Sequence, residues 1–134
     1  MTITNSIRQA LDAHLSTMPS VPDIAFQGVS YEQEPLTTHI RVEFIPTSRR
    51  PANRGPNPQN RHQGLYIMTV CTPEDNGTGP ALDVADDLMG RFDGSSDVAG
   101  IEVDVSIDYS EAGTGFMDPP FYCVPVSVAW YTYS

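Results

Sequence analysis

Apolar residues recur at two different spacings along the chain, and these spacings separate helices from strands. In the first eighteen residues they recur every three or four positions, which predicts an amphipathic helix that ends before Pro19. The same spacing predicts a second helix from about Pro80 to Phe92, with proline at its first position. The expected buried stripes are Ile3, Ile7, Leu11, Leu15 and Met18 in the first helix, and Leu82, Ala85, Leu88, Met89 and Phe92 in the second.

Other segments carry the pattern of strands. Residues 38–45 and 101–108 alternate between apolar and polar side chains, which predicts two strands with one buried face each. Residues 65–71 are apolar on both faces and predict a central strand. The last strand is predicted over 121–133, where Pro125 requires an edge or a bulge because proline donates no backbone hydrogen bond. A short strand near Ile24 completes the set.

The order of these elements predicts an α+β fold, a mainly antiparallel sheet of four to five strands with two helices packed on one face. At 134 residues the chain is expected to form a single domain, residues 1–134. Residues 46–64 are rich in proline, asparagine and arginine and show no apolar periodicity, so they predict a long flexible loop. The strands on either side of this loop should pair as a hairpin, and so should the last two strands.

Charge separates this loop from the rest of the chain. The formal net charge is −10 and the chain contains no lysine, yet four arginines fall within residues 46–64 without an acid among them. The planar guanidinium binds carboxylates through paired hydrogen bonds and suits interfaces. We therefore predict that the loop docks on another protein, with a merely soluble loop as the alternative. The predicted interface residues are Arg49, Arg50, Arg54 and Arg61.

Aromatic residues near the C-terminal end are a second candidate contact surface. They occur on both faces of the last predicted strand, which exceeds the need of one core face. Tyrosine and tryptophan are enriched in protein interfaces, although a core with scattered surface tyrosines would also explain them. The residues are Tyr109, Phe116, Phe121, Tyr122, Trp130, Tyr131 and Tyr133.

Motifs that would carry chemistry are missing from the sequence. The three histidines fall in segments predicted as helix, strand and loop, and no nucleophile elbow or phosphate-binding loop is present. Residues 75–79 resemble the start of a calcium loop but lack its later glutamate. Cys71 and Cys123 lie in apolar runs without the spacing of a metal site, so we expect buried reduced thiols. We predict no catalytic residues, no metal and no cofactor.

The element order and the closing strand resemble the tail terminator family of long-tailed bacteriophages. The resemblance includes the helix that opens with Pro-Ala-Leu at residues 80–82, the Gly-Thr-Gly loop at 113–115 and the run Phe-Tyr-Cys-Val-Pro-Val-Ser-Val-Ala-Trp-Tyr at 121–131. It implies a structural virion protein, not an enzyme, that forms a homohexameric ring at the head-proximal end of the tail. Such a ring caps the tube, stops its polymerisation and offers the head-joining surface.

The resemblance also implies partners. These are other copies of the chain, the major tail tube protein and a head-completion or neck protein, with assembly in the host cytoplasm and no membrane contact. DNA would only pass through, and an acidic lumen would repel phosphate where a cationic one would hold it. We expect acids on exposed faces to line that lumen. The candidates are Asp83, Asp86, Asp87, Glu102, Asp104 and Asp108.

Three other functions fit parts of the sequence. Another neck or tail-completion subunit would share the fold but sit elsewhere in the virion. A small cytoplasmic enzyme could use residues 109–120 as an active-site lid, which would require titratable groups gathered in a cleft. A small binding module could dock acidic peptides through its arginines and would remain a monomer.

Overall fold

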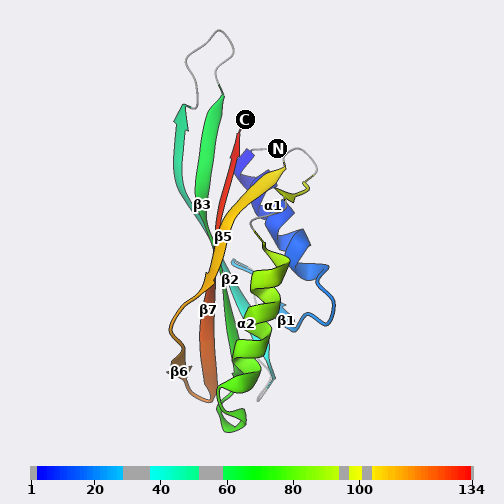
Figure 1. Cartoon of the computed structure of the whole chain (residues 1–134), viewed down its shortest axis with the longest axis vertical. Helices are drawn as coiled ribbons and strands as arrows, with labels where there is room; N and C mark the ends of the chain where they lie inside the picture. Colours follow the sequence, from blue (N-terminus) through cyan, green and yellow to red (C-terminus); the bar gives the residue numbers. More distant parts are fainter. Residues whose placement is uncertain (1–2, 29–36, 52–58, 94–96, 101–103, 134) are drawn as a thin grey trace.

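Two helices cover one face of a twisted sheet in the computed structural model (Figure 1). The structure describes residues 3–28, 37–51, 59–93, 97–100 and 104–133. The helices are α1 (Ile3–Ser16) and α2 (Gly79–Arg91), and a short 3-10 helix, η1 (Glu74–Asn76), precedes α2. No described helix is both long and apolar enough to cross a membrane.

The sheet confirms the predicted α+β class and its mainly antiparallel order. Its strands run in the order β1-β2-β3-β7-β5-β4, β6 pairs with β7, and only β1 and β2 are parallel. Both expected hairpin pairings, β2 with β3 and β5 with β7, are present. The bounds are β1 Asp23–Ala25, β2 His39–Pro51, β3 Asn60–Pro73, β4 Asp97–Val98, β5 Val105–Ala112, β6 Phe116–Asp118 and β7 Phe121–Tyr133.

The predicted loop over 46–64 is wrong at both of its ends. Residues 46–51 continue β2 and residues 60–64 begin β3, while residues 52–58 lie outside the described part of the chain. Pro46 does not end the strand, because the register shifts between Pro46 and Ser48 and the resulting bulge accommodates the proline. Pairing with β7 on its other side supports β3 across this region. The polar composition of the segment gives no sign of that partner.

The last two strands also differ from the prediction in register. β5 begins at Val105 and runs to Ala112, so the expected strand over 101–108 is displaced, and residues 101–103 lie outside the description. Its register against β7 shifts at Asp108, a bulge that breaks the sequence alternation. Pro125 lies where β5 has ended and β6 has not begun, with its carbonyl accepting from the Gly113 N–H at 2.7 Å. The ladder is therefore interrupted where proline cannot donate.

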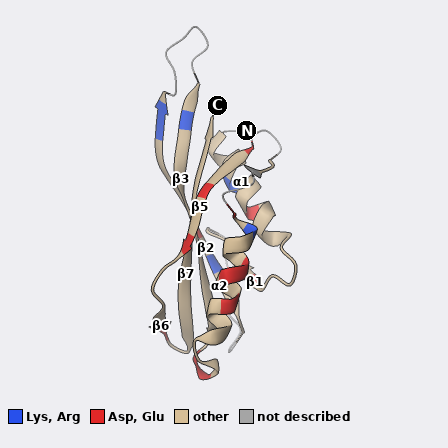
Figure 2. Cartoon of the chain, in the orientation of Figure 1, with Lys and Arg blue, Asp and Glu red and all other residues tan. Residues whose placement is uncertain are grey.

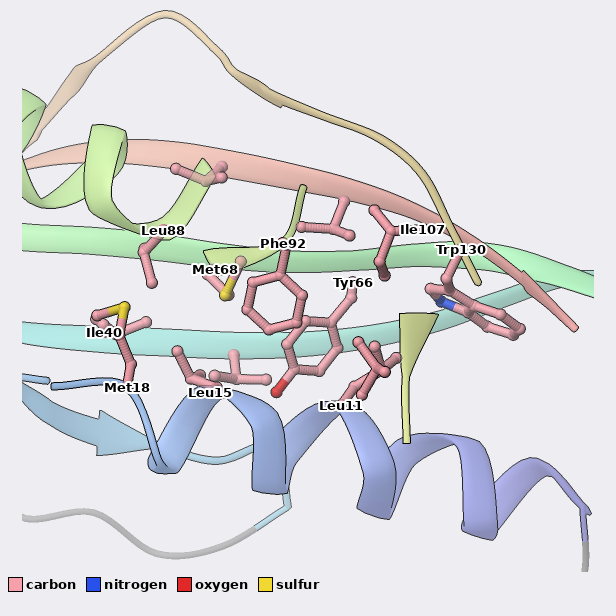
Figure 3. Close-up of a cluster of buried hydrophobic side chains, with 14 of the residues drawn as sticks. Leu11, Leu15, Met18, Ile40, Tyr66, Met68, Leu88, Phe92, Ile107 and Trp130 are labelled. Carbon is pink, nitrogen blue, oxygen red and sulfur yellow. The ribbon is translucent and has the colours of Figure 1, made fainter. Parts of the chain in front are cut away.

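The core lies between the helices and the covered face of the sheet (Figure 3). The predicted stripe of α1 is confirmed, since its four later members are buried and Ile3 packs against them. In α2, Ala85, Leu88 and Phe92 are buried as expected, but Leu82 is 46% exposed. Ala81 takes its place, because positions 81, 85, 88 and 92 form one straight stripe at helical spacing and Leu82 lies one step around the helix.

The two cysteines form a disulfide, so the expectation of reduced thiols is wrong. Cys71 of β3 and Cys123 of β7 lie directly opposite each other, with their Cα atoms 4.1 Å apart. Both are fully buried beside Phe121. Two residues 52 apart in the chain become neighbours only when the two strands pair in this register, which the sequence pattern does not specify.

One polar contact lies inside the covered layer and ties α1 to the sheet. The fully buried Tyr66 donates its hydroxyl to Asp12 Oδ1 at 2.5 Å, and Arg8 Nη1 contacts Asp12 Oδ2 at 2.8 Å. Burial raises the pKa of the Asp12 carboxyl, although the hydrogen bond from Tyr66 and the charge of Arg8 oppose the shift. Burial also raises the pKa of Tyr66, with the Asp12 charge adding to it. Asp12 thus accepts hydrogen bonds from Tyr66 and Arg8 in a partly buried site, where burial disfavours the ionised carboxylate.

Replacing Asp12 by asparagine should flatten part of the pH dependence of stability. An acid whose folded pKa is raised binds its proton more tightly in the folded state. The free energy of unfolding should therefore fall as pH rises from the ordinary value of 3.8 through the folded pKa. D12N keeps an acceptor for Tyr66 but does not titrate, so this fall should disappear. Urea unfolding across a pH series measures it, with the exposed D86N as the control that keeps the wild-type profile.

Gly64 should not tolerate a side chain. A Cβ there would overlap the Ile45 carbonyl oxygen and lie 2.7 Å from Trp130 Cζ2 and 2.9 Å from Pro46 Cα. Because two of these atoms belong to backbone, G64A should lower the free energy of unfolding by about 1–3 kcal/mol. G90A is the matched control, since nothing lies within 4 Å of its Cβ and alanine favours a helix by about 1 kcal/mol. Equal stability of the two variants would contradict the packing.

Candidate assembly surface

The structure brings three of the four predicted interface arginines to one place. Arg49 and Arg50 lie near the end of β2, and Arg61 lies opposite Arg50 near the start of β3. Arg54 falls outside the described residues. These strands project beyond both helices, and the arginines mark the projecting end (Figure 2). We call residues 46–51 and 60–64 the arginine hairpin.

No described carboxylate neutralises these three arginines. The described ion pairs are Arg8–Asp12 and Arg41–Asp118, both outside the hairpin. Arg61 instead lies over the ring of Tyr131, 4.7 Å from its centroid, which favours the cation but leaves its charge in place. With its amide oxygen turned toward Arg49, Asn60 accepts at 3.3 and 3.0 Å from that guanidinium. The hairpin therefore presents positive charge that the rest of the described chain leaves uncompensated.

A hollow of about 260 Å³ lies between this hairpin and the start of α1. Burial lowers the pKa of His62, and the charge of Arg49 lowers it further. Two buried polar atoms in the wall, Ser48 Oγ and Trp130 Nε1, have no hydrogen-bond partner among the described residues. No acid contributes to the wall and Arg49 does, so the hollow suits an anionic group. Its lining is Ile3, Thr4, Ile7, Pro46, Thr47, Ser48, Arg49, His62 and Trp130.

The predicted lumen residues occupy two places that do not include the arginine hairpin. Asp83, Asp86 and Asp87 are exposed along the outer side of α2. Asp104 and Asp108 are exposed at β5, the first just before the strand and the second at its bulge, while Glu102 lies outside the description. Figure 2 shows acids along β5 and α2, away from the arginines. Their lining of a channel stays a prediction.

The sheet face opposite the helices carries accessible apolar side chains set among polar ones. It carries half-buried side chains from β2, β3 and β7 that no described helix covers. Tyr109 and Phe116 on the same face are 48% and 45% exposed, whereas Phe121 and Trp130 of the predicted aromatic surface lie buried. Accessible apolar and aromatic side chains gathered on one face are typical of an interaction site. Its half-buried members are Ile45, Leu65, Ile67, Ala129 and Tyr131.

The pattern of β3 could have revealed this face. Residues 65–71 are apolar on both faces, which predicts a central strand, and β3 is one. The chain supplies helices for one layer only, so Leu65 and Ile67 stay accessible.

The histidines serve separate contacts and do not form a shared site. His14 Nε2 lies 2.8 Å from the Arg91 carbonyl oxygen, and Arg91 Nε donates to the His14 carbonyl at 3.1 Å, which joins α1 to the end of α2. His39 Nε2 accepts from Arg41 Nε at 3.3 Å, and Arg41 Nη1 donates to Asp118 at 2.7 Å. Sequence spacing did not indicate this group because Asp118 lies 77 residues from Arg41 in the chain. The described residues hold no group of three side chains suited to a metal.

Comparison with known proteins gives a family and solved structures of the same fold. The family model described as "Phage tail terminator protein" matches residues 6–130. A solved structure whose title names no function superimposes with a TM-score of 0.74 over 100% of this chain and 97% of its own, at 18% identity. That likeness concerns the fold alone. No curated protein matches the chain.

Proposed function

The chain belongs to the phage tail terminator family, and we propose that its copies form a six-membered ring that caps the tail tube and stops its polymerisation. Family membership makes the chain a tail-completion protein, a structural component of the virion tail. The observation that carries the more specific proposal is the projecting hairpin with three arginines that lack an acid partner in the described chain. Clustered guanidinium groups without an internal partner are suited to contacts with acidic surfaces.

The bare sheet face supports assembly in the same way. An apolar surface that a monomer leaves in water is stabilised when a second protein covers it. Here it adjoins the arginine hairpin through Arg61 and Tyr131, so charged and apolar contacts would act on one interface. Arginine and tyrosine are the residue types that dominate such interfaces.

We further propose that the ring stands at the head-proximal end of the tail, assembles in the host cytoplasm and catalyses nothing. One side of the ring would meet the major tail tube protein and the other a head-completion or neck protein. Acids of α2 would face the channel, where negative charge repels the phosphates of passing DNA. A cryo-EM map of the assembled tail locates the subunit, and a map with Asp83, Asp86 and Asp87 all on the outer wall would reject the channel assignment.

Replacing all four arginines by serine (R49S, R50S, R54S and R61S) should abolish ring formation and tail completion while leaving the monomer folded. Arg49 and Arg50 are exposed near the end of β2, Arg61 is half-buried, and none of the three belongs to the hydrophobic core. Light scattering on the purified variant should report a monomer, and its thermal unfolding should match the wild type within a few degrees.

The matched control replaces the same four residues by lysine. This variant keeps the net charge but loses the planar fork of the guanidinium. Partial assembly by the lysine variant would assign the contact to both charge and geometry. Normal tails formed by the serine variant would remove the arginine hairpin from the interface.

A further inference from the structure

The two outer edges of the sheet differ in charge. β1 covers β2 only at residues 39–41, and β4 covers β5 only at residues 105–106, so the remainder of each strand is an edge within the described chain. The β2 edge ends in Arg49 and Arg50. The β5 edge is acidic, with Asp104 just before the strand and Asp108 and Glu111 within it, all exposed.

This difference selects how two copies can meet. Two β5 edges would bring carboxylates together, and two β2 edges whose contact centres on Arg49 and Arg50 would bring arginines together, so both of these two-fold arrangements are repelled. A β2 edge against a β5 edge pairs opposite charges. That contact joins different surfaces of the two copies, and a head-to-tail contact of this kind generates closed rings when its rotation closes.

The two edges also lie at matching heights on the sheet. Arg49 pairs with His62, which pairs with Thr132 of β7. The Thr132 hydroxyl donates to the Asp104 carbonyl oxygen at 2.7 Å, so Asp104 lies at the same end of β7. Asp108 lies about two residues further down, beside Trp130 and Ala129. A neighbouring copy placed side by side would therefore bring its acids level with the arginines.

The acid-free hollow beside Arg49 provides a place for one of these carboxylates. Its buried Ser48 Oγ and Trp130 Nε1 have no described acceptor, and Arg49 contributes positive charge to the same wall. An acid brought in by a neighbour would meet the positive charge of Arg49 in this hollow.

From these observations we infer that the β2 edge of one copy docks head to tail on the β5 edge of the next, with Arg49 and Arg50 against Asp104 and Asp108. This inference rests on the proposed ring and specifies its subunit contact. It moves Asp104 and Asp108 from the channel to the interface and leaves the channel to the acids of α2.

Complementary charge reversal tests the contact. One variant carries R49D and R50D, so both of its edges are acidic; the other carries D104R and D108R, so both are basic. Each variant alone should lose the oligomer seen by analytical ultracentrifugation. An equimolar mixture should regain it, because each copy then has a neighbour of opposite charge on both sides, and native mass spectrometry should find the two chains in equal numbers.

The matched control carries D83R and D86R, the same charge change placed on α2. It should form the wild-type oligomer, and circular dichroism should show all variants folded. Assembly of either reversed variant alone, failure of the mixture, or equal loss in the control would overturn the edge contact while leaving the ring in place. A wild-type chain that stays monomeric at high concentration and in the presence of tail tubes would instead overturn the ring itself, and the contact with it.

Discussion

The pairing of β3 with β7 is the contact on which the other elements depend. The two strands run antiparallel along almost their whole lengths, from Arg61 opposite Tyr133 to Pro73 opposite Phe121. β2 and β5 attach to their outer sides, and both helices pack on the face that their alternate residues form. Because β3 and β7 are long, the sheet extends beyond the helices, which creates the projecting arginine hairpin and places it beside the C-terminal aromatics.

Coverage of only one face sets the character of the surface. The two helices, of 14 and 13 residues, cover one face of the sheet. Apolar residues on the other face, which a second layer of helices would bury, therefore stay accessible. The isolated chain leaves this surface in water, and association can remove it. The same one-sidedness leaves both sheet edges open over much of their length, where Pro46 and the bulges at β2 and β5 hinder unspecific strand pairing.

The distribution of charge determines which of these open surfaces can attract each other. A net charge of −10 would disperse copies if it were spread evenly. Here Arg49 and Arg50 lie on one sheet edge, Asp104, Asp108 and Glu111 lie at the other, and further acids lie on α2 (Figure 2). Attraction is then possible between unlike surfaces only, which favours a ring over a two-fold dimer. In the proposed ring the acids of α2 would remain free to face passing DNA.

The sequence by itself determined the elements and their class. Periodicity placed both helices within a residue or two and placed β7 from Phe121 to Tyr133, because the spacing of buried side chains is a local property of helices and strands. Composition identified the arginines and the exposed acids of α2, since charged residues seldom lie buried without a partner. The burial of Leu82 was predicted wrongly because neighbouring positions of a helix lie on different faces. A short apolar pattern defines the buried face only to within about one residue.

The tertiary structure decided the features that depend on strand order and register. It turned residues 46–51 and 60–64 from an expected loop into strands, because β3 gains a partner in β7 that lies sixty residues further on. It joined Cys71 to Cys123 and shifted β5 through a bulge at Asp108. Long-range pairing and register arise from contacts between distant segments, so no local pattern records them, and the opposite charges of the two sheet edges became visible only once the strand order was known.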